Sequence, residues 1–174
     1  MSTEIKEYIV TTFSENQIGV LNRITAIYLR RKINIESLRV SESSIKGIST
    51  FIISAYTSQE IIEKVVKQIN RIIEVLDSKY YTTNELITQE IALYKISKTF
   101  FDCPDSFNTI SSNKGARVID MRDNYIVVEV AGSRQDIELL AENLREKGVL
   151  EQFTRSGSVV LHREKIETIL QNKI

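Results

Sequence analysis

The sequence predicts an α+β protein made of two βαββαβ domains in tandem. In the first half, strand-type alternation and helix-type spacing of apolar residues follow one another in the order strand, helix, strand, strand, helix, strand. The same order recurs, less regularly, in the second half. Between the halves, residues 81–88 are polar and show neither the two-residue period of a strand nor the 3.6-residue period of a helix. Each half is therefore expected to lay its helices on one face of an antiparallel sheet.

Apolar residues in the first domain, residues 1–80, follow both periods. Phe51, Ile53 and Ala55 recur at every second position, as on one face of a strand. Helical spacing gives the second expected helix an apolar stripe of Ile62, Val65, Val66, Ile69 and Ile73. We interpret this stripe as core. The expected strands are 7–13, 34–43, 47–56 and 73–80, and the expected helices are 18–31 and 59–72.

The second domain, residues 89–174, contains the most direct internal match. Residues 58–63 and 133–138 each begin with a Ser in N-cap position, followed by acidic residues and an apolar stripe. The expected strands are 89–97, 116–122, 125–131, 150–154 and 158–162, and the expected helices are 105–112, 134–147 and one from Glu164. Residues 81–88 are the expected linker between the domains.

Composition is that of an ordinary globular protein. Hydrophobic residues make up 42% of the 174 residues and charged residues 26%, which argues against disorder. Lys and Arg balance Asp and Glu at 23 each, so no net charge attracts nucleic acid or an anionic membrane. The first residues lack a signal-peptide core, and no segment reaches the length of a membrane span. The single cysteine, Cys103, excludes an internal disulfide, and we expect a cytoplasmic protein.

Residues suited to autonomous catalysis are few. The one histidine, His162, lies in an expected strand without a positioned partner, and Cys103 precedes Pro104 with no histidine nearby. The sequence has no zinc-ligand spacing, P-loop or glycine-rich dinucleotide turn, and its scattered tyrosines argue against an RNA-recognition domain. We therefore assign no catalytic, cofactor-binding or metal-ligating residue. The pattern favours a binding module, with a small enzyme acting through His162 or carboxylates as the alternative.

Two polar motifs flank the first expected helix and form a candidate binding site. Residues 15–19, Glu-Asn-Gln-Ile-Gly, occupy the strand-to-helix turn, where free amide groups and the helix dipole can hold a carboxylate. Gly19 lets a ligand approach the backbone closely. Residues 34–38, Asn-Ile-Glu-Ser-Leu, follow the helix. The structural alternative is that Asn16 caps the helix and Asn34 fills a turn.

The expected helix keeps the two motifs apart within one chain. At ~1.5 Å per residue it places Asn16 and Asn34 roughly 20 Å from each other, too far for one small ligand. A two-fold axis that pairs the following strand with its copy would bring Asn16 and Gly19 of one protomer beside Asn34 of its partner. Each Asn offers a donor and an acceptor, which suits an amino acid zwitterion. Val20 could line the side-chain end of such a pocket, although helix core is an equally good interpretation of its position.

Three runs resemble the small, regulatory subunit of acetolactate synthase (acetohydroxyacid synthase). They are residues 15–23, Glu-Asn-Gln-Ile-Gly-Val-Leu-Asn-Arg, residues 30–38, Arg-Arg-Lys-Ile-Asn-Ile-Glu-Ser-Leu, and residues 155–161, Arg-Ser-Gly-Ser-Val-Val-Leu. The resemblance implies two ferredoxin-like domains, of which the first is an ACT domain that dimerises side by side. It also implies a branched-chain amino acid, usually valine, bound at the dimer interface. The positions matching the family's effector contacts are Asn16, Gly19 and Asn34, with Ile18, Val20 and Ile35 as neighbouring candidates.

The resemblance further implies a catalytic partner. A separate large subunit would hold thiamine diphosphate, Mg²⁺ and FAD and make 2-acetolactate from pyruvate, whereas this chain would carry no cofactor. The small subunit would raise the partner's activity and confer feedback inhibition by valine in branched-chain amino acid biosynthesis. A stand-alone amino-acid sensor of the ACT type, without that partner, is the alternative.

Two places depart from the family's pattern. Lys32 and Ile33 stand where the family usually has a glycine before an aromatic-Asn pair, so the exit from the first helix is expected to differ in detail. In the second half, residues 111–113, Ser-Ser-Asn, stand where the family tends to have a Phe-Arg-type pair, and Pro104 and Gly115 interrupt the nearby helix. The N-terminal site is left largely intact by these changes.

Overall fold

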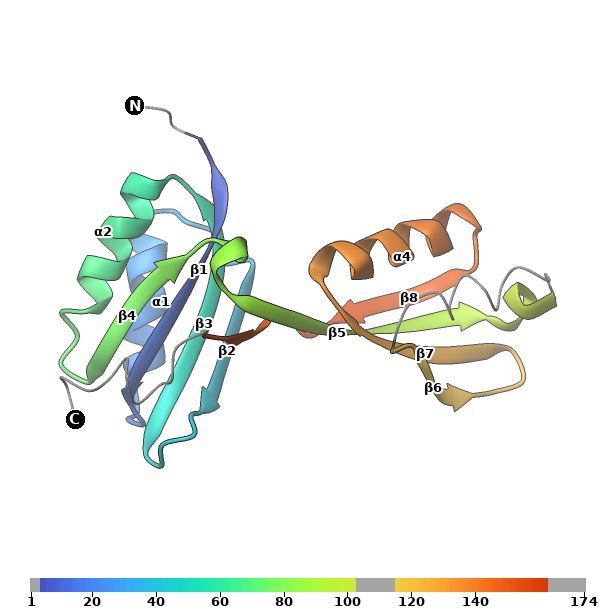
Figure 1. Ribbon diagram of the computed structural model, residues 1–174, viewed down its shortest axis with the longest axis horizontal. Coiled ribbons are helices and arrows are strands. Elements are labelled where there is room, and N and C mark those ends of the chain that lie inside the picture. Colours follow the sequence, from blue (N-terminus) through green and yellow to red (C-terminus); the bar gives the residue numbers. More distant parts are fainter. Residues whose placement is uncertain (1–3, 103–114, 163–174) are drawn as a thin grey trace. The chain divides into compact units, whose positions relative to one another are not determined.

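The computed structural model describes residues 4–102 and 115–162 (Figure 1). These residues fall into two compact units, one of residues 4–87 with 160–162 and one of the described residues between 88 and 159. The expected helices at 105–112 and from Glu164 lie outside the described residues. So do Cys103, Pro104 and residues 111–113.

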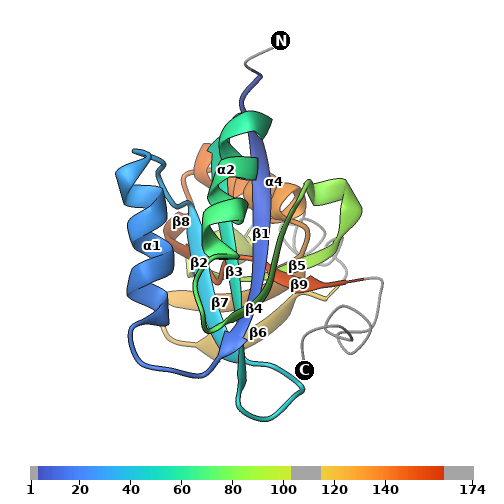
Figure 2. The same cartoon turned by 90° about the vertical axis from the view of Figure 1, so that its left-hand side faces the viewer.

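The first unit has the element order that the sequence predicts. Its four strands form one antiparallel sheet in the order β2-β3-β1-β4. Both helices lie side by side against one face of this sheet (Figure 2). The elements are β1 (Lys6–Glu15), α1 (Val20–Arg30), β2 (Ser37–Glu42), β3 (Ile48–Thr57), α2 (Gln59–Ile69), β4 (Val75–Tyr81) and the 3-10 turn η1 (Thr83–Glu85).

The core of the first unit lies between the helices and the sheet. Ile24 of α1 and Ile62 of α2 are fully buried and belong to one cluster with Val10 of β1 and Ile53 of β3. Burying each such side chain contributes about 1.5–3 kcal/mol, so the apolar stripes are what hold the helices to the sheet. The opposite face of the sheet is also covered, by a smaller cluster that includes Leu86.

One residue of the expected helical stripe is misassigned. Ile73 is 93% exposed and lies beyond the end of α2. Helix α2 stops early because the side-chain amide of Asn70 donates to the Ser78 carbonyl and accepts from the Ser78 N–H, both at 2.9 Å. This pair of hydrogen bonds ties the end of α2 to β4 and turns the chain before Ile73.

The ring of His162 packs against aromatic side chains of the first unit. Its centroid lies 6.0 Å from that of Phe13 and 5.1 Å from that of Tyr81. These contacts make His162 part of the cover over the second face of the sheet, which is a packing role.

The second unit has one antiparallel sheet in the order β6-β7-β5-β8, with β9 also paired to β5. Helix α4 covers one face of it, and Ser133 caps the helix as expected by accepting from the Asp136 N–H at 3.2 Å. The predicted fold class, two α+β domains with antiparallel sheets, is confirmed. The elements are β5 (Ile87–Ser97), the 3-10 turn η2 (Lys98–Asp102), β6 (Arg117–Met121), β7 (Tyr125–Gly132), α4 (Arg134–Glu146) and β8 (Leu150–Arg155), with β9 (Val159–Leu161) beginning at the last residue of this unit.

The two units each bury a tyrosine, with opposite outcomes for its hydroxyl. Tyr94 Oη donates to the Ile137 carbonyl at 2.8 Å. Tyr28 Oη is buried without a hydrogen-bond partner in the part of the chain that the structure describes. Burial raises the pKa of both hydroxyls well above the usual value, so both stay neutral.

This contrast gives a matched pair of variants. We expect Tyr28→Phe to raise the free energy of unfolding by about 1 kcal/mol, because it removes a buried hydroxyl that makes no compensating bond. Tyr94→Phe is expected to lower the free energy of unfolding by about 1 kcal/mol, because the hydrogen bond from the Tyr94 hydroxyl to the Ile137 carbonyl is lost. Urea denaturation of both variants measures the difference. An equal loss in the two proteins would contradict the assignment of Tyr28 as unpaired.

Candidate functional site

The first polar motif forms the turn between β1 and α1. The backbone N–H of Asn16 donates to the Gly47 carbonyl at 2.9 Å, which fastens the turn to the loop before β3. Within the turn, Gln17 Nε2 donates to Glu15 Oε2 at 2.7 Å. Gly19 then takes φ 89° and ψ −10°, in the left-handed region, and is the N-cap residue of α1. Helix α1 begins at the next residue, Val20. Glycine suits the N-cap position here because it adopts a left-handed conformation without strain.

The start of α1 carries no side-chain cap and no acidic residue in its first turn. Asn16 does not cap the helix, and its exposed side chain makes no hydrogen bond within the described residues. Nothing lies within 4 Å of the place where a Cβ on Gly19 would stand. The first-turn amide groups and the helix dipole are thus accessible to an anion.

The apolar neighbours in this turn differ in exposure. The Ile18 side chain is fully exposed, whereas Val20 is only 1% exposed and belongs to the core with Ile24. Of the two interpretations of Val20, core packing is the one that the structure supports.

Helix α1 ends in a Schellman motif that has a lysine in the place of glycine. The N–H of Lys32 donates to the Leu29 carbonyl at 2.9 Å, and the N–H of Ile33 donates to the Tyr28 carbonyl at 3.1 Å. Lys32 has φ 55°, the only positive φ of a non-glycine residue in the described part of the chain. Lys32 thus adopts the left-handed conformation that glycine usually supplies at this position of a helix end.

The second polar motif continues from that turn. Asn34 is exposed and its Nδ2 donates to Glu36 Oε1 at 2.9 Å. Ile35 is partly buried and packs against the core of the first unit. Strand β2 begins only at Ser37, later than expected from the sequence.

The structure does not bring all the predicted site residues together in one protomer. Asn16 and Gly19 share the turn before α1, and Asn34 lies beyond its other end. The 11 residues of α1 span about 16 Å at ~1.5 Å per residue. A ligand that contacts both motifs therefore needs a second copy of the chain.

Strand β2 offers an edge for such a copy. Within the described residues it pairs with β3 alone, so its outer backbone groups are free for another strand. Leu38 and Val40 lie opposite Ile53 and Phe51, on the face of the sheet that carries the core, yet they are 40% and 44% exposed. Leu38 is the last residue of the second polar motif, and Val40 lies outside both motifs. Their alternation with Arg39 and Ser41 was the available signal.

The third run, residues 155–161, fastens the end of the second unit. Arg155 Nη1 donates to the buried Glu90 Oε2 at 3.0 Å, and Ser158 Oγ donates to Glu90 Oε1 at 2.8 Å. Arg155 Nε also lies 3.3 Å from Glu138 Oε1 on α4. Ser156 accepts from the Ile91 N–H at 3.1 Å. The run satisfies a buried carboxylate, which is a structural role.

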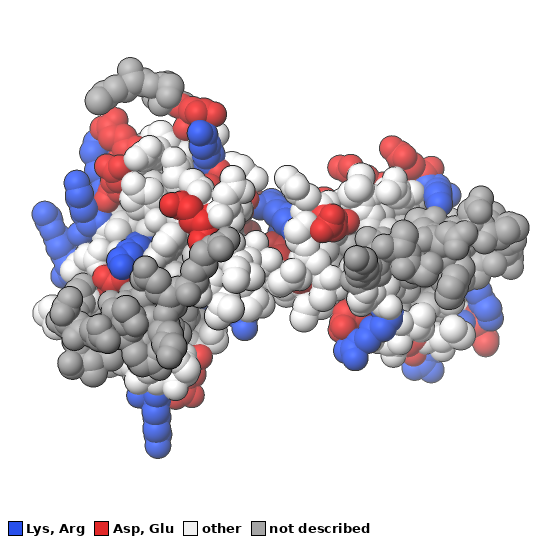
Figure 3. All heavy atoms as spheres, viewed as in Figure 1, with Lys and Arg blue, Asp and Glu red and all other residues white. Residues whose placement is uncertain are grey.

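The described residues show no sign of a metal centre or of a membrane-spanning helix. Within residues 4–102 and 115–162, no group of three His, Cys, Asp or Glu side chains is placed so that it could bind a metal ion. Among the described helices, none combines the length and apolar character that a membrane span requires. Acidic and basic side chains are interspersed on the face drawn in Figure 3.

Comparisons with known proteins cover nearly the whole chain. Residues 11–77 match a family model described as the AHAS small subunit-like ACT domain, and residues 89–164 match one described as the small subunit of acetolactate synthase. The acetolactate synthase small subunit of Bacillus subtilis is 32% identical over 170 residues, covering 95% of each chain. That of Aquifex aeolicus is 31% identical over 161 residues, covering 92% of this chain and 83% of the relative. The crystal structure of the small subunit from Thermotoga maritima superposes with a TM-score of 0.79 at 26% identity, covering 93% of this chain and 100% of the other.

The conformation of Lys32 predicts a stabilising substitution. We expect Lys32→Gly to raise the free energy of unfolding by about 1 kcal/mol, because a left-handed backbone costs a residue with a Cβ roughly that much. Lys32→Ala, which removes the charge but keeps the Cβ, is the control and should bring no gain. Thermal or urea denaturation compares the three proteins. A glycine variant no more stable than the alanine variant would contradict this reasoning.

Proposed function

The chain belongs to the acetolactate synthase small subunits, and from this membership we propose that it is the regulatory subunit of a two-component acetolactate synthase. Its role there is to activate a catalytic large subunit and to make that subunit sensitive to valine. The observation that carries the proposal is the match over 95% of both this chain and the Bacillus subtilis small subunit.

The large subunit is the place for the cofactors in this proposal. Thiamine diphosphate, Mg²⁺ and FAD belong to it, and it converts pyruvate to 2-acetolactate. This chain contributes binding and regulation. Its single histidine is packed among aromatic rings, which fits a non-catalytic role.

We place the effector site at a homodimer interface formed by the β2 edges. Two β2 strands running antiparallel would join the two sheets and cover Leu38 and Val40. The effector's carboxylate would meet the uncapped start of α1 at Gly19, and its ammonium group would meet the amide oxygens of Asn16 and of the partner's Asn34. The aliphatic side chain of the effector would contact the exposed Ile18 and the half-buried Ile35.

Regulation then follows from linkage between the two binding events. Valine that bridges two protomers favours the dimer arrangement in which both halves of the site are closed. If the large subunit binds that arrangement with a different affinity and is activated by it to a different degree, valine changes the rate of acetolactate formation. The factor by which valine changes the affinity for the large subunit is then also the factor by which the large subunit changes the affinity for valine. Couplings of this kind are typically about 1–3 kcal/mol.

Reconstitution with the cognate large subunit tests the proposal. Acetolactate formation should rise when this chain is added and fall again when valine is added. A flavoprotein should co-purify with the chain. If no such protein co-purifies and the large subunit is not activated, but valine still binds, the chain is a stand-alone sensor. Turnover of pyruvate by the purified chain alone would instead support an enzyme.

The shared site predicts a specific loss of valine sensitivity. Asn16→Ala and Asn34→Ala should each weaken valine binding by about tenfold, because each removes a hydrogen bond to a charged group of the effector. Activation of the large subunit should persist in both variants. Asn143→Ala, an exposed amide on α4 of the second unit, is the matched control. Calorimetry that finds wild-type affinity for valine in the Asn16 variant would refute the assignment.

A further inference from the structure

A hollow lies between α1 and the end of α2. Its volume is about 450 Å³, within the range of about 300–1,000 Å³ that is typical of small-ligand pockets. Three arginines, two side-chain amides and three apolar residues line it: Asn22, Arg23, Ala26, Ile27, Arg30, Gln68, Arg71 and Ile72. We call it the α1–α2 hollow. None of its residues belongs to the effector site placed at the β2 edge.

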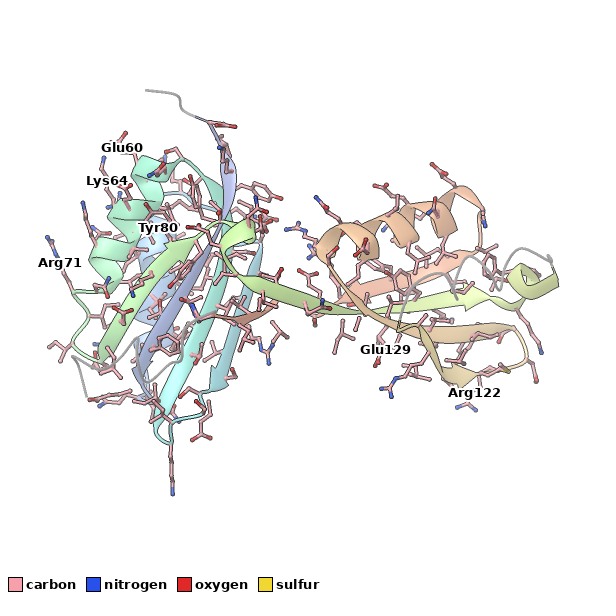
Figure 4. The ribbon with its side chains drawn as sticks, in the orientation of Figure 1. Glu60, Lys64, Arg71, Tyr80, Arg122 and Glu129 are labelled. Atoms are coloured by element: carbon pink, nitrogen blue, oxygen red, sulfur yellow. The ribbon has the colours of Figure 1, made fainter. Side chains whose placement is uncertain are left out.

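The positive charge of the α1–α2 hollow is only partly compensated. Arg23 Nη2 contacts Glu74 Oε1 at 2.7 Å. The side chains of Arg30 and Arg71 make no hydrogen bond or ion pair with any residue that the structure describes, and Figure 4 shows the Arg71 side chain directed away from the ribbon just beyond α2. Both residues are exposed, so their positive charges are available to an anion that enters the hollow.

The carboxylate beside the hollow does not cancel this charge. The hydrogen bond from Arg23 lowers the pKa of Glu74 below its usual value, so this carboxyl is ionised at neutral pH and neutralises Arg23. The net positive charge of the hollow therefore rests on Arg30 and Arg71. No Asp or Glu is among the residues that line the hollow.

The polar groups of the hollow are mainly donors. A guanidinium group has no acceptor atom. Gln68 Oε1 already accepts from Arg31 Nε at 3.3 Å, which leaves the Gln68 amide N–H groups to donate. Ala26, Ile27 and Ile72 supply apolar contact beside these donors. A ligand that is rich in acceptors, carries at least two negative charges and has limited size fits this combination.

We propose that the α1–α2 hollow is a binding site for a small phosphate-bearing ligand, held by Arg30 and Arg71 and by the Gln68 amide. The planar guanidinium fork matches phosphate oxygens in pairs, which makes arginine the side chain of choice for such groups. Two arginines on different elements, α1 and the turn after α2, can hold two phosphate groups or two edges of one. The site is separate from the valine site, and its occupancy does not depend on the large subunit.

Calorimetric titration of the full chain with pyrophosphate, at constant ionic strength, tests this site. The wild-type chain should bind pyrophosphate, and the double variant Arg30→Gln/Arg71→Gln should bind at least about tenfold more weakly, because both charge-assisted contacts are lost. Lys64→Gln removes a cation from α2 that does not line the hollow, so it should bind as the wild type does. Circular dichroism checks that all three proteins are folded.

Orthophosphate and a nucleoside diphosphate are the two further titrants. Tighter binding of the nucleoside diphosphate than of pyrophosphate would identify a nucleotide, and equal binding would identify the phosphate groups alone as the recognised feature. The inference is overturned if the wild-type chain binds none of the three, or if the double variant binds them as tightly as the Lys64 variant. Valine binding and activation of the large subunit should be unchanged in the double variant. If the chain binds none of the phosphate ligands, the phosphate site is therefore refuted and the proposed function is unaffected.

Discussion

The packing of α1 on the first sheet is the interaction on which the candidate site depends. Ile24, Ile27 and Tyr28 bury one face of α1 against the strands, and this fixes both the position and the direction of the helix. The turn at Gly19 and the turn at Lys32 are then held at a set separation. Because α1 is too long for one small ligand to bridge its ends, the same packing that builds the domain also prevents Asn16 and Asn34 of one protomer from contacting the same small ligand.

The β2 edge shows a second consequence of the same architecture. The two helices cover the middle of the sheet and leave Leu38 and Val40 of the edge strand partly exposed. Exposed apolar residues on an unpaired strand favour association, and a two-fold pairing would remove both the apolar surface and the free backbone groups. A regulatory domain whose ligand bridges two copies gains from an interface that is incomplete in the monomer, since ligand binding and association then reinforce each other.

The second unit depends on a buried ionic network. Glu90 is almost fully buried and is satisfied by Arg155 and Ser158, while Arg155 also approaches Glu138 on α4. Removing one partner from such a network is costly, because a charge is then left buried without compensation. This accounts for an Arg-Ser-Gly-Ser run in which each hydroxyl and the guanidinium have specific partners, with Gly157 in the left-handed region at φ 72°. Residues 155–161 resemble a family motif in the sequence, and in the structure Arg155 and Ser158 of this run donate hydrogen bonds to the Glu90 carboxylate.

The sequence alone determined the order of elements in the first unit, the fold class, the turn at Gly19 and the separation of Asn16 from Asn34, because alternation, helical spacing and turn residues are local properties of the chain. Tertiary structure decided what depends on neighbours distant in sequence. It put Val20 in the core, ended α2 through the bonds from Asn70 to Ser78, and left Ile73 and the β2 edge exposed. It also gathered the arginines of α1 and of the turn after α2 around one hollow. Periodicity shows which residues share a face, but burial and charge compensation are set by what packs against that face.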